Sequence, residues 1–169
     1  MAETMVRMGE YAFSATAGDM LVSLGLGSCI GLALLDRRAT VAGLAHVVLP
    51  AAEGRDGAPG KFADTAVPAL LEAVLGLGAR RMRLEAVLVG GASMFSFGGN
   101  GLEVGQRNDA AVRAELAKLR IPVLAADTGG SKGRTVRVNV GTGLVTSKAA
   151  GETEVELYPK PLTTTRVAA

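Results

Sequence analysis

One thiol and one imidazole are the side chains of this sequence best suited to nucleophilic chemistry. Cys29 is the only cysteine and His46 is the only histidine. A free thiol has a pKa of about 8.5 and is mostly protonated at neutral pH, so a nucleophilic cysteine needs a base close to it. His46 is the only side chain whose ordinary pKa lies near neutrality. The two residues are therefore a candidate nucleophile and base.

A glycine-rich turn comes directly before the thiol. Residues 23–29 read Ser-Leu-Gly-Leu-Gly-Ser-Cys. Gly25 and Gly27 let the backbone approach a substrate closely, and nearby N–H groups can point at a developing oxyanion. Gly27 and Ser28 are therefore candidate oxyanion or substrate-binding residues.

Both candidate catalytic residues also have a structural interpretation. A lone cysteine at the head of an apolar strand is often a small buried hydrophobe, and a lone histidine in an apolar run can be a satisfied core residue. If segments 29–36 and 41–49 pair as a hairpin, their far ends meet and Cys29 lies near His46. Composition and spacing leave the catalytic and the structural interpretations both open.

Short apolar runs bounded by turn formers predict a sheet-rich domain. Strands are expected at 10–16, 20–26, 29–36, 41–49, 83–89, 121–126 and 135–140, with a short edge strand at 154–158. Gly18 and Asp19 predict a hairpin-type turn between the first two strands. The nearly continuous apolar runs 29–36 and 41–49 are typical of strands covered on both faces.

Two further segments have helical spacing. Residues 62–77 predict a helix that begins close to Pro68, since proline is tolerated in the first turn. Asn108 is expected to be the N-cap of a second helix that ends at Leu119. Together the elements indicate an α/β fold, a single-domain layered sandwich of mixed β-sheet flanked by two main helices. The domain is expected to span residues 1–169, with a core of about 8–145 and a tail of about 146–169.

The composition argues against several classes of protein and site. A net charge of +2 and 4% aromatic residues argue against a nucleic-acid partner. No run reaches the roughly 18 apolar residues of a membrane span, so no membrane insertion is expected. The N-terminal residues lack the apolar core of a signal peptide, and we expect a cytoplasmic location. A single cysteine rules out an internal disulfide or multi-thiolate zinc site, and no metal or other cofactor is expected.

Five glycine-containing blocks follow one another along the chain. They are Leu24-Gly-Leu-Gly-Ser-Cys-Ile-Gly31, Gly43-Leu-Ala-His-Val-Val-Leu-Pro50, Gly90-Gly-Ala92, Gly105-Gln-Arg-Asn108, and Asp127-Thr-Gly-Gly130 with Gly133-Arg134. In this order they resemble the CheD family, the protein-glutamine deamidases of bacterial and archaeal chemotaxis. The resemblance implies an α/β sandwich related to the catalytic domains of certain deamidating bacterial toxins.

The resemblance also implies an activity, partners and roles for residues. The activity is cysteine-dependent deamidation of selected glutamines on the cytoplasmic helices of chemoreceptors, with Cys29 as the nucleophile that forms a thioester and His46 as the base. A third position, six residues before the cysteine, is typically threonine, and this sequence has Ser23 there. Serine keeps a hydroxyl that can orient His46 but lacks the branch that restricts χ1. In some relatives a CheC-type phosphatase is a further partner.

Three other functions use the same residues. An amidase or esterase that acts on receptor methyl esters would differ only in the leaving group. A regulatory binding module that docks on receptors or on a CheC-type phosphatase would leave Cys29 catalytically idle. A thiol redox sensor is disfavoured because the chain has no second cysteine to resolve an oxidised thiol.

Overall fold

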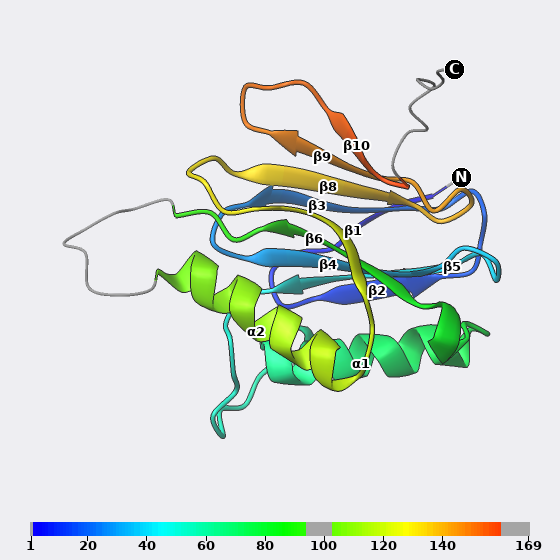
Figure 1. Cartoon of the computed structure of the whole chain (residues 1–169), viewed down its shortest axis with the longest axis horizontal. Helices are drawn as coiled ribbons and strands as arrows, with labels where there is room; N and C mark the ends of the chain where they lie inside the picture. Colours follow the sequence, from blue (N-terminus) through cyan, green and yellow to red (C-terminus); the bar gives the residue numbers. More distant parts are fainter. Residues whose placement is uncertain (1, 94–102, 160–169) are drawn as a thin grey trace, which may run out of the picture.

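Two five-stranded sheets stack face to face, and two helices cover the outer face of one of them (Figure 1). The computed structural model describes residues 2–93 and 103–159. Sheet A has the order β1 (Glu3–Met5), β3 (Met20–Leu26), β8 (Arg134–Asn139), β9 (Val145–Ala149), β10 (Val155–Tyr158). Sheet B has the order β2 (Tyr11–Ser14), β5 (Val41–Val47), β4 (Ile30–Asp36), β6 (Glu85–Gly90), β7 (Val123–Thr128). Helix α1 spans Ala63–Gly76 and helix α2 spans Val104–Lys118, with short 3-10 turns at Pro59–Lys61 and Arg81–Arg83. The α/β layered sandwich expected from the sequence is confirmed.

Strands β4 and β5 form the centre of the molecule and are buried along their whole length. Leu32 and Leu34 of β4 point to a core shared with the helices, whereas Ala33 and Leu35 belong to a second core between the two sheets. Successive residues of a strand point to opposite faces, so a strand covered on both sides must be apolar at every position. The prediction from these two apolar runs is confirmed.

The predicted hairpin between residues 10–16 and 20–26 is wrong, although both strands exist. β2 pairs with β5 in sheet B, whereas β3 pairs with β1 and β8 in sheet A. The turn itself forms, and Ser14 Oγ donates to Asp19 Oδ2 at 2.6 Å. Because the chain crosses between the sheets, Leu21 of β3 and Ala12 of β2 contribute to the same core from opposite sides, which buries Leu21 fully and Ala12 partly.

Both helices begin earlier than the sequence predicts. Helix α1 begins at Ala63, and Pro68 lies inside it. The buried residues Ala66 and Val67 belong to the helix–sheet core, and this burial outweighs the one N–H that proline cannot donate. Helix α2 begins at Val104, so Asn108 lies in its second turn and is not the N-cap.

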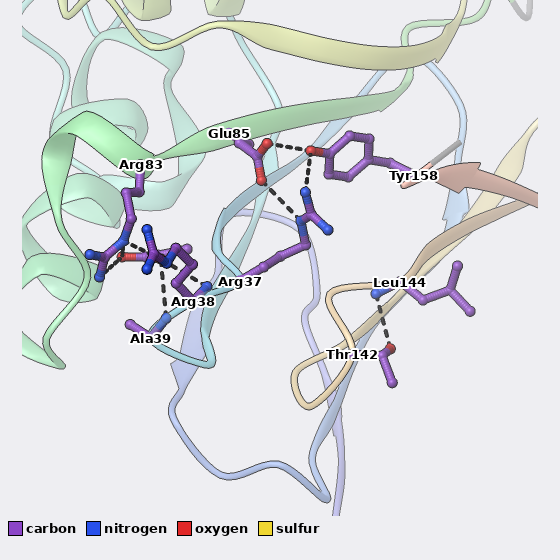
Figure 2. Close-up of polar contacts among 9 residues, drawn as sticks. Arg37, Arg38, Ala39, Arg83, Glu85, Thr142, Leu144 and Tyr158 are labelled. Atoms are coloured by element: carbon purple, nitrogen blue, oxygen red, sulfur yellow. Dashed lines mark hydrogen bonds and ion pairs between the residues drawn. The ribbon is translucent and has the colours of Figure 1, made fainter. Parts of the chain in front are cut away.

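The last two strands complete sheet A, and a polar network joins β10 to sheet B. The edge strand predicted at 154–158 is confirmed as β10, whereas β9 was not predicted. Arg37 donates from Nε to Glu85 at 3.1 Å and from Nη2 to the hydroxyl of Tyr158 at 3.2 Å (Figure 2). The Tyr158 hydroxyl donates to the other carboxylate oxygen of Glu85. This network lies at the C-terminal end of β4, whereas Cys29 precedes its N-terminal end.

Candidate active site

The β4–β5 pair places Cys29 and His46 on the same face of sheet B. The two strands pair as the hairpin that the sequence allowed, and in their antiparallel register Gly31 is opposite His46. Cys29 lies two residues before Gly31 and therefore on the same face, diagonal to His46. Diagonal neighbours lie about 7–8 Å apart. This register brings the only thiol and the only imidazole together, and the sequence alone could not determine it.

This shared face points into the core between the sheets. A Cβ added to Gly31 would lie 3.0 Å from Leu26 Cδ1 and 3.0 Å from Val136 Cγ1, both in sheet A. The thiol and the imidazole therefore project toward sheet A from the end of sheet B at which β4 begins and β5 ends. Cys29 is 8% exposed and His46 is 4% exposed.

Ser23 reaches the same place from sheet A, and the carbonyl of Val6 links it to His46. Ser23 Oγ donates to Val6 O at 2.7 Å, and His46 Nδ1 lies 3.0 Å from the same oxygen. Within the part of the chain that the structure describes, no hydrogen bond joins Ser23 to His46 directly. The serine therefore contacts the acceptor of the imidazole and not the ring.

The Val6 carbonyl also determines which ring nitrogen of His46 carries the proton. A carbonyl oxygen can only accept, so the neutral imidazole donates from Nδ1 and keeps its lone pair on Nε2. The main chain of His46 is also fixed, because His46 N donates to Glu10 O at 3.0 Å and His46 O accepts from Gly9 N at 2.9 Å. The result is an imidazole of fixed orientation with a basic nitrogen available.

Burial keeps both groups of the pair uncharged. It raises the pKa of the Cys29 thiol above its ordinary value. Burial also lowers the pKa of His46, against the smaller opposing effects of the Val6 carbonyl and the Glu10 carboxylate. Near neutral pH the thiol is therefore protonated and the imidazole is not. Among the described residues no hydrogen bond joins Cys29 to His46, and catalytic hydrogen bonds commonly tighten only when substrate binds.

The glycine pair at the end of β6 holds the loop that carries the thiol. Gly91 N donates to Cys29 O, and Ala92 N donates to Gly27 O, both at 2.8 Å. Gly90 has a φ of +117°, and a Cβ added there would lie 2.2 Å from Cys29 O. Only glycine allows this approach, which explains the Gly-Gly-Ala block at 90–92.

The N–H groups of residues 27–29 are left available by this arrangement. The carbonyl groups of the loop face the rest of the protein, and the three N–H groups have no hydrogen-bond partner among residues 2–93 and 103–159. Gly25 has a φ of +61° within a bulge between Ser23 and Leu26, where the chain leaves β3 for this loop. Consecutive free N–H groups beside a thiol are the donors that an oxyanion requires.

The comparisons with known proteins give the family. Residues 48–149, more than half of the chain, match the family model described as CheD chemotactic sensory transduction. A chemoreceptor glutamine deamidase CheD of Thermotoga maritima is 43% identical over 154 residues, which cover 90% of this chain and 96% of the relative. A probable chemoreceptor glutamine deamidase CheD of Desulfitobacterium hafniense is 48% identical over 75% of this chain and 81% of the relative. Another, of Pyrococcus horikoshii, is 42% identical over 92% of this chain and 97% of the relative. The chain belongs to the CheD family.

Two contributors to this CheD-family site could not be identified as such from the sequence. Val6 acts through its backbone carbonyl, which leaves no mark in the residue type. Asn108 was expected to be a helix cap, but its fully buried side chain reaches the loop that carries Cys29. Its occurrence in the Gly105-Gln-Arg-Asn108 block was the one available signal.

The described residues contain no group of three or more His, Cys, Asp and Glu side chains placed to hold a metal ion. Neither α1 nor α2, nor any other helix in the part of the chain that the structure describes, is long and apolar enough to cross a membrane.

Proposed function

We propose that this protein is a cysteine-dependent protein-glutamine deamidase that converts selected glutamines of methyl-accepting chemotaxis receptors to glutamates. In this reaction Cys29 forms a thioester and His46 is the base. The names of the relatives support the reaction and the substrate. The observation that carries the assignment of residues is the juxtaposition of the only thiol and the only imidazole on one face, with the ring proton on Nδ1.

The first half of the reaction transfers an acyl group to the thiol. His46 Nε2 removes the proton from Cys29 as the sulfur attacks the side-chain carboxamide carbon of glutamine. The carbonyl oxygen becomes an oxyanion, which the N–H groups of residues 27–29 stabilise. When the tetrahedral intermediate collapses, the C–N bond breaks and protonated His46 donates its proton to the departing nitrogen. Ammonia leaves and a thioester remains.

The second half hydrolyses the thioester. His46 Nε2 removes a proton from a water molecule, which attacks the thioester carbonyl. The C–S bond breaks, the sulfur regains a proton, and glutamate is released. The net reaction consumes one water and releases one ammonia for each glutamine, and it requires no metal or organic cofactor.

Ser23 and Val6 act as positioning groups in this mechanism. The bond from Nδ1 to the Val6 carbonyl persists when His46 becomes protonated on Nε2, and it then stabilises the imidazolium. Ser23 holds the same carbonyl in place at 2.7 Å. The serine therefore orients His46 through the backbone, as a threonine hydroxyl could in its place.

The proposed partners follow from the reaction. The substrate is the cytoplasmic helical region of a chemoreceptor, which places the protein in the cytoplasm. A CheC-type phosphatase remains an expectation that rests on the resemblance to some relatives. The assignment of residues 1–169 to a single domain and the relation of that domain to deamidating toxins both stay predictions.

Ammonia release from a purified receptor cytoplasmic fragment tests this proposal. We expect release with the wild-type protein, none with Cys29→Ala, and a loss of about 10²-fold or more with His46→Gln. Equal release by the wild type and Cys29→Ala would refute the assignment of the nucleophile.

Two parallel assays separate the alternatives. Methanol released from a methylated receptor, without ammonia from the amidated one, would identify an esterase. Full chemotaxis supported by Cys29→Ala in cells, with no ammonia from the wild type, would identify a regulatory binding module.

A further inference from the structure

The side chain of Asn108 connects the two segments that carry the proposed catalytic residues. Its Nδ2 donates to Ser28 O at 2.9 Å and to Val48 O at 2.9 Å. Ser28 directly precedes Cys29, and Val48 lies two residues after His46. One carboxamide group on helix α2 thus joins the loop of the nucleophile to the end of the strand of the base.

The chemistry of its two partners fixes the orientation of this carboxamide. Both are carbonyl oxygens, which only accept, so the NH₂ group of Asn108 must face them. Asn108 is fully buried, and its Oδ1 has no hydrogen-bond partner among the described residues. The side chain therefore keeps both donated bonds although its own acceptor has no partner in the described part of the chain, whereas buried polar groups are usually satisfied. A residue selected only for packing at this position would be apolar.

Helix α2 is fixed at this point by backbone contact. A Cβ added to Gly105 would lie 2.5 Å from Gly91 O and 2.6 Å from Ala92 O. Gly91 and Ala92 are the residues whose N–H groups hold the carbonyls of Cys29 and Gly27. The first turn of α2 therefore packs directly on the segment that supports the thiol loop. This close contact gives Asn108 a defined position relative to both of its partners.

The loop carbonyls are consequently held by two separate elements. Gly91 and Ala92 bind the carbonyls of Cys29 and Gly27, and Asn108 binds the remaining carbonyl, that of Ser28. Of these three residues, Asn108 is the one that also binds the segment directly after β5, through Val48. Its loss would leave the loop tied to β6, and to β5 through the ladder that begins at Ile30, but would remove the side chain that joins Ser28 to Val48.

We propose that Asn108 is a positioning residue that sets the spacing between the Cys29 thiol and the His46 imidazole. This inference rests on the function proposed above and adds a residue to the same site. Nucleophile and base must be within hydrogen-bond reach in the reacting complex, and a displacement of about 1 Å can cost about 10²-fold in rate. Asn108 touches neither the substrate nor the reacting atoms and acts through the backbone of Ser28 and Val48.

The test compares Asn108→Leu with Val112→Ala. Leucine has a similar size but no donor, and Asn108→Ala provides a second variant that relieves any overpacking. Val112 lies one turn later on the same buried face of α2 and belongs to the core between the helices and sheet B, so Val112→Ala destabilises the same helix and keeps the carboxamide of Asn108. Circular dichroism confirms folding, and the kinetic constants for ammonia release from the receptor fragment are measured at 25 °C.

A second readout is independent of the receptor. The rate of alkylation of Cys29 by iodoacetamide, followed by intact-protein mass across a pH series, reports the deprotonation of the thiol. In the wild type the profile should show an inflection from the titration of His46, because the unprotonated imidazole assists the thiol. Without the correct spacing this inflection disappears.

We expect Asn108→Leu and Asn108→Ala to lower kcat by about 10²-fold with KM within about twofold of wild type, and to remove the inflection. Val112→Ala should keep kcat within about threefold and retain the inflection. Asn108 variants that behave like Val112→Ala in both readouts overturn the inference. If the wild type releases no ammonia, the proposed function fails, and the alkylation profile alone tests the positioning role. An inflection that Asn108→Leu retains overturns this role, and an inflection that Asn108→Leu loses supports it.

Discussion

Replacing Gly90 by alanine should displace the nucleophile without touching any catalytic side chain. Gly90 ends β6, and a Cβ added there would lie 2.2 Å from the carbonyl oxygen of Cys29. Real Cβ atoms essentially never approach another atom closer than 3.0 Å, so one of the two backbone segments must move by at least about 0.8 Å. Gly91 N holds the same oxygen at 2.8 Å and resists this movement.

The structure gives the expected magnitudes and a matched control. Gly78 has a φ of +104°, close to the +117° of Gly90, but a Cβ added there would meet nothing within 4 Å. Gly78→Ala should therefore cost only the backbone strain, about 1–3 kcal/mol. Gly90→Ala should cost a further 1–3 kcal/mol, about the usual penalty for overpacking. A displacement of about 1 Å should also lower kcat by about 10²-fold, which corresponds to about 2.7 kcal/mol in the barrier.

The assay combines urea unfolding with the kinetics of ammonia release. Both variants should unfold at lower urea concentrations than the wild type, and only Gly90→Ala should lose kcat at a temperature where all three proteins are folded. If Gly90→Ala retained wild-type kcat, or if Gly78→Ala lost as much, the contact between β6 and Cys29 would not control the nucleophile and the reasoning would be refuted.

Three further predictions concern Ser23, His46 and Asp36. Ser23→Ala should lower kcat by about tenfold because the Val6 carbonyl loses one of its two donors, whereas Ser23→Thr should keep kcat within about threefold of wild type. Equal kinetics for the wild type and Ser23→Ala would contradict this. The folded pKa of His46 lies below its ordinary 6.5, so the unfolded state takes up the proton first as the pH falls below 6.5 and the folded protein loses stability. Urea unfolding at about pH 7.5 and about pH 5 should show a smaller loss for His46→Gln than for wild type, and identical losses would contradict the cause assigned to the shift. Asp36→Asn should reduce the free energy of unfolding by about 3 kcal/mol, because the buried carboxylate accepts hydrogen bonds from three backbone N–H groups and from Arg83. It should leave kcat unchanged because Asp36 lies at the opposite end of β4 from Cys29, and a loss of kcat in the folded variant would contradict this.

The central strands were predictable because their signal is local. Uninterrupted apolar residues in β4 and β5 indicate burial on both faces, and a short connection between them favours a hairpin. Such a hairpin would bring Cys29 near His46, and the structure has this pairing. By contrast, the turn at Gly18–Asp19 was identified correctly but does not determine whether the next strand returns to the same sheet. That choice depends on which core the apolar faces of β2 and β3 must cover.

The remaining site residues depend on partners far away in the sequence. Asn108 binds carbonyls 80 and 60 residues earlier in the chain, so no local pattern could distinguish this role from that of a helix cap. Val6 contributes a backbone oxygen that any residue would supply. Pro68 lies inside a helix because burial of neighbouring apolar residues outweighs its missing N–H, and this balance is decided by packing against sheet B.

Peptide mass spectrometry of a purified receptor cytoplasmic fragment tests the central claim most directly. The fragment is incubated with the wild-type protein and with Cys29→Ala, and each glutamine is then examined. The account predicts a gain of about one mass unit at particular glutamines with the wild type and no gain with the variant. An unchanged receptor after incubation with the wild type, or the same gain with Cys29→Ala, would contradict it.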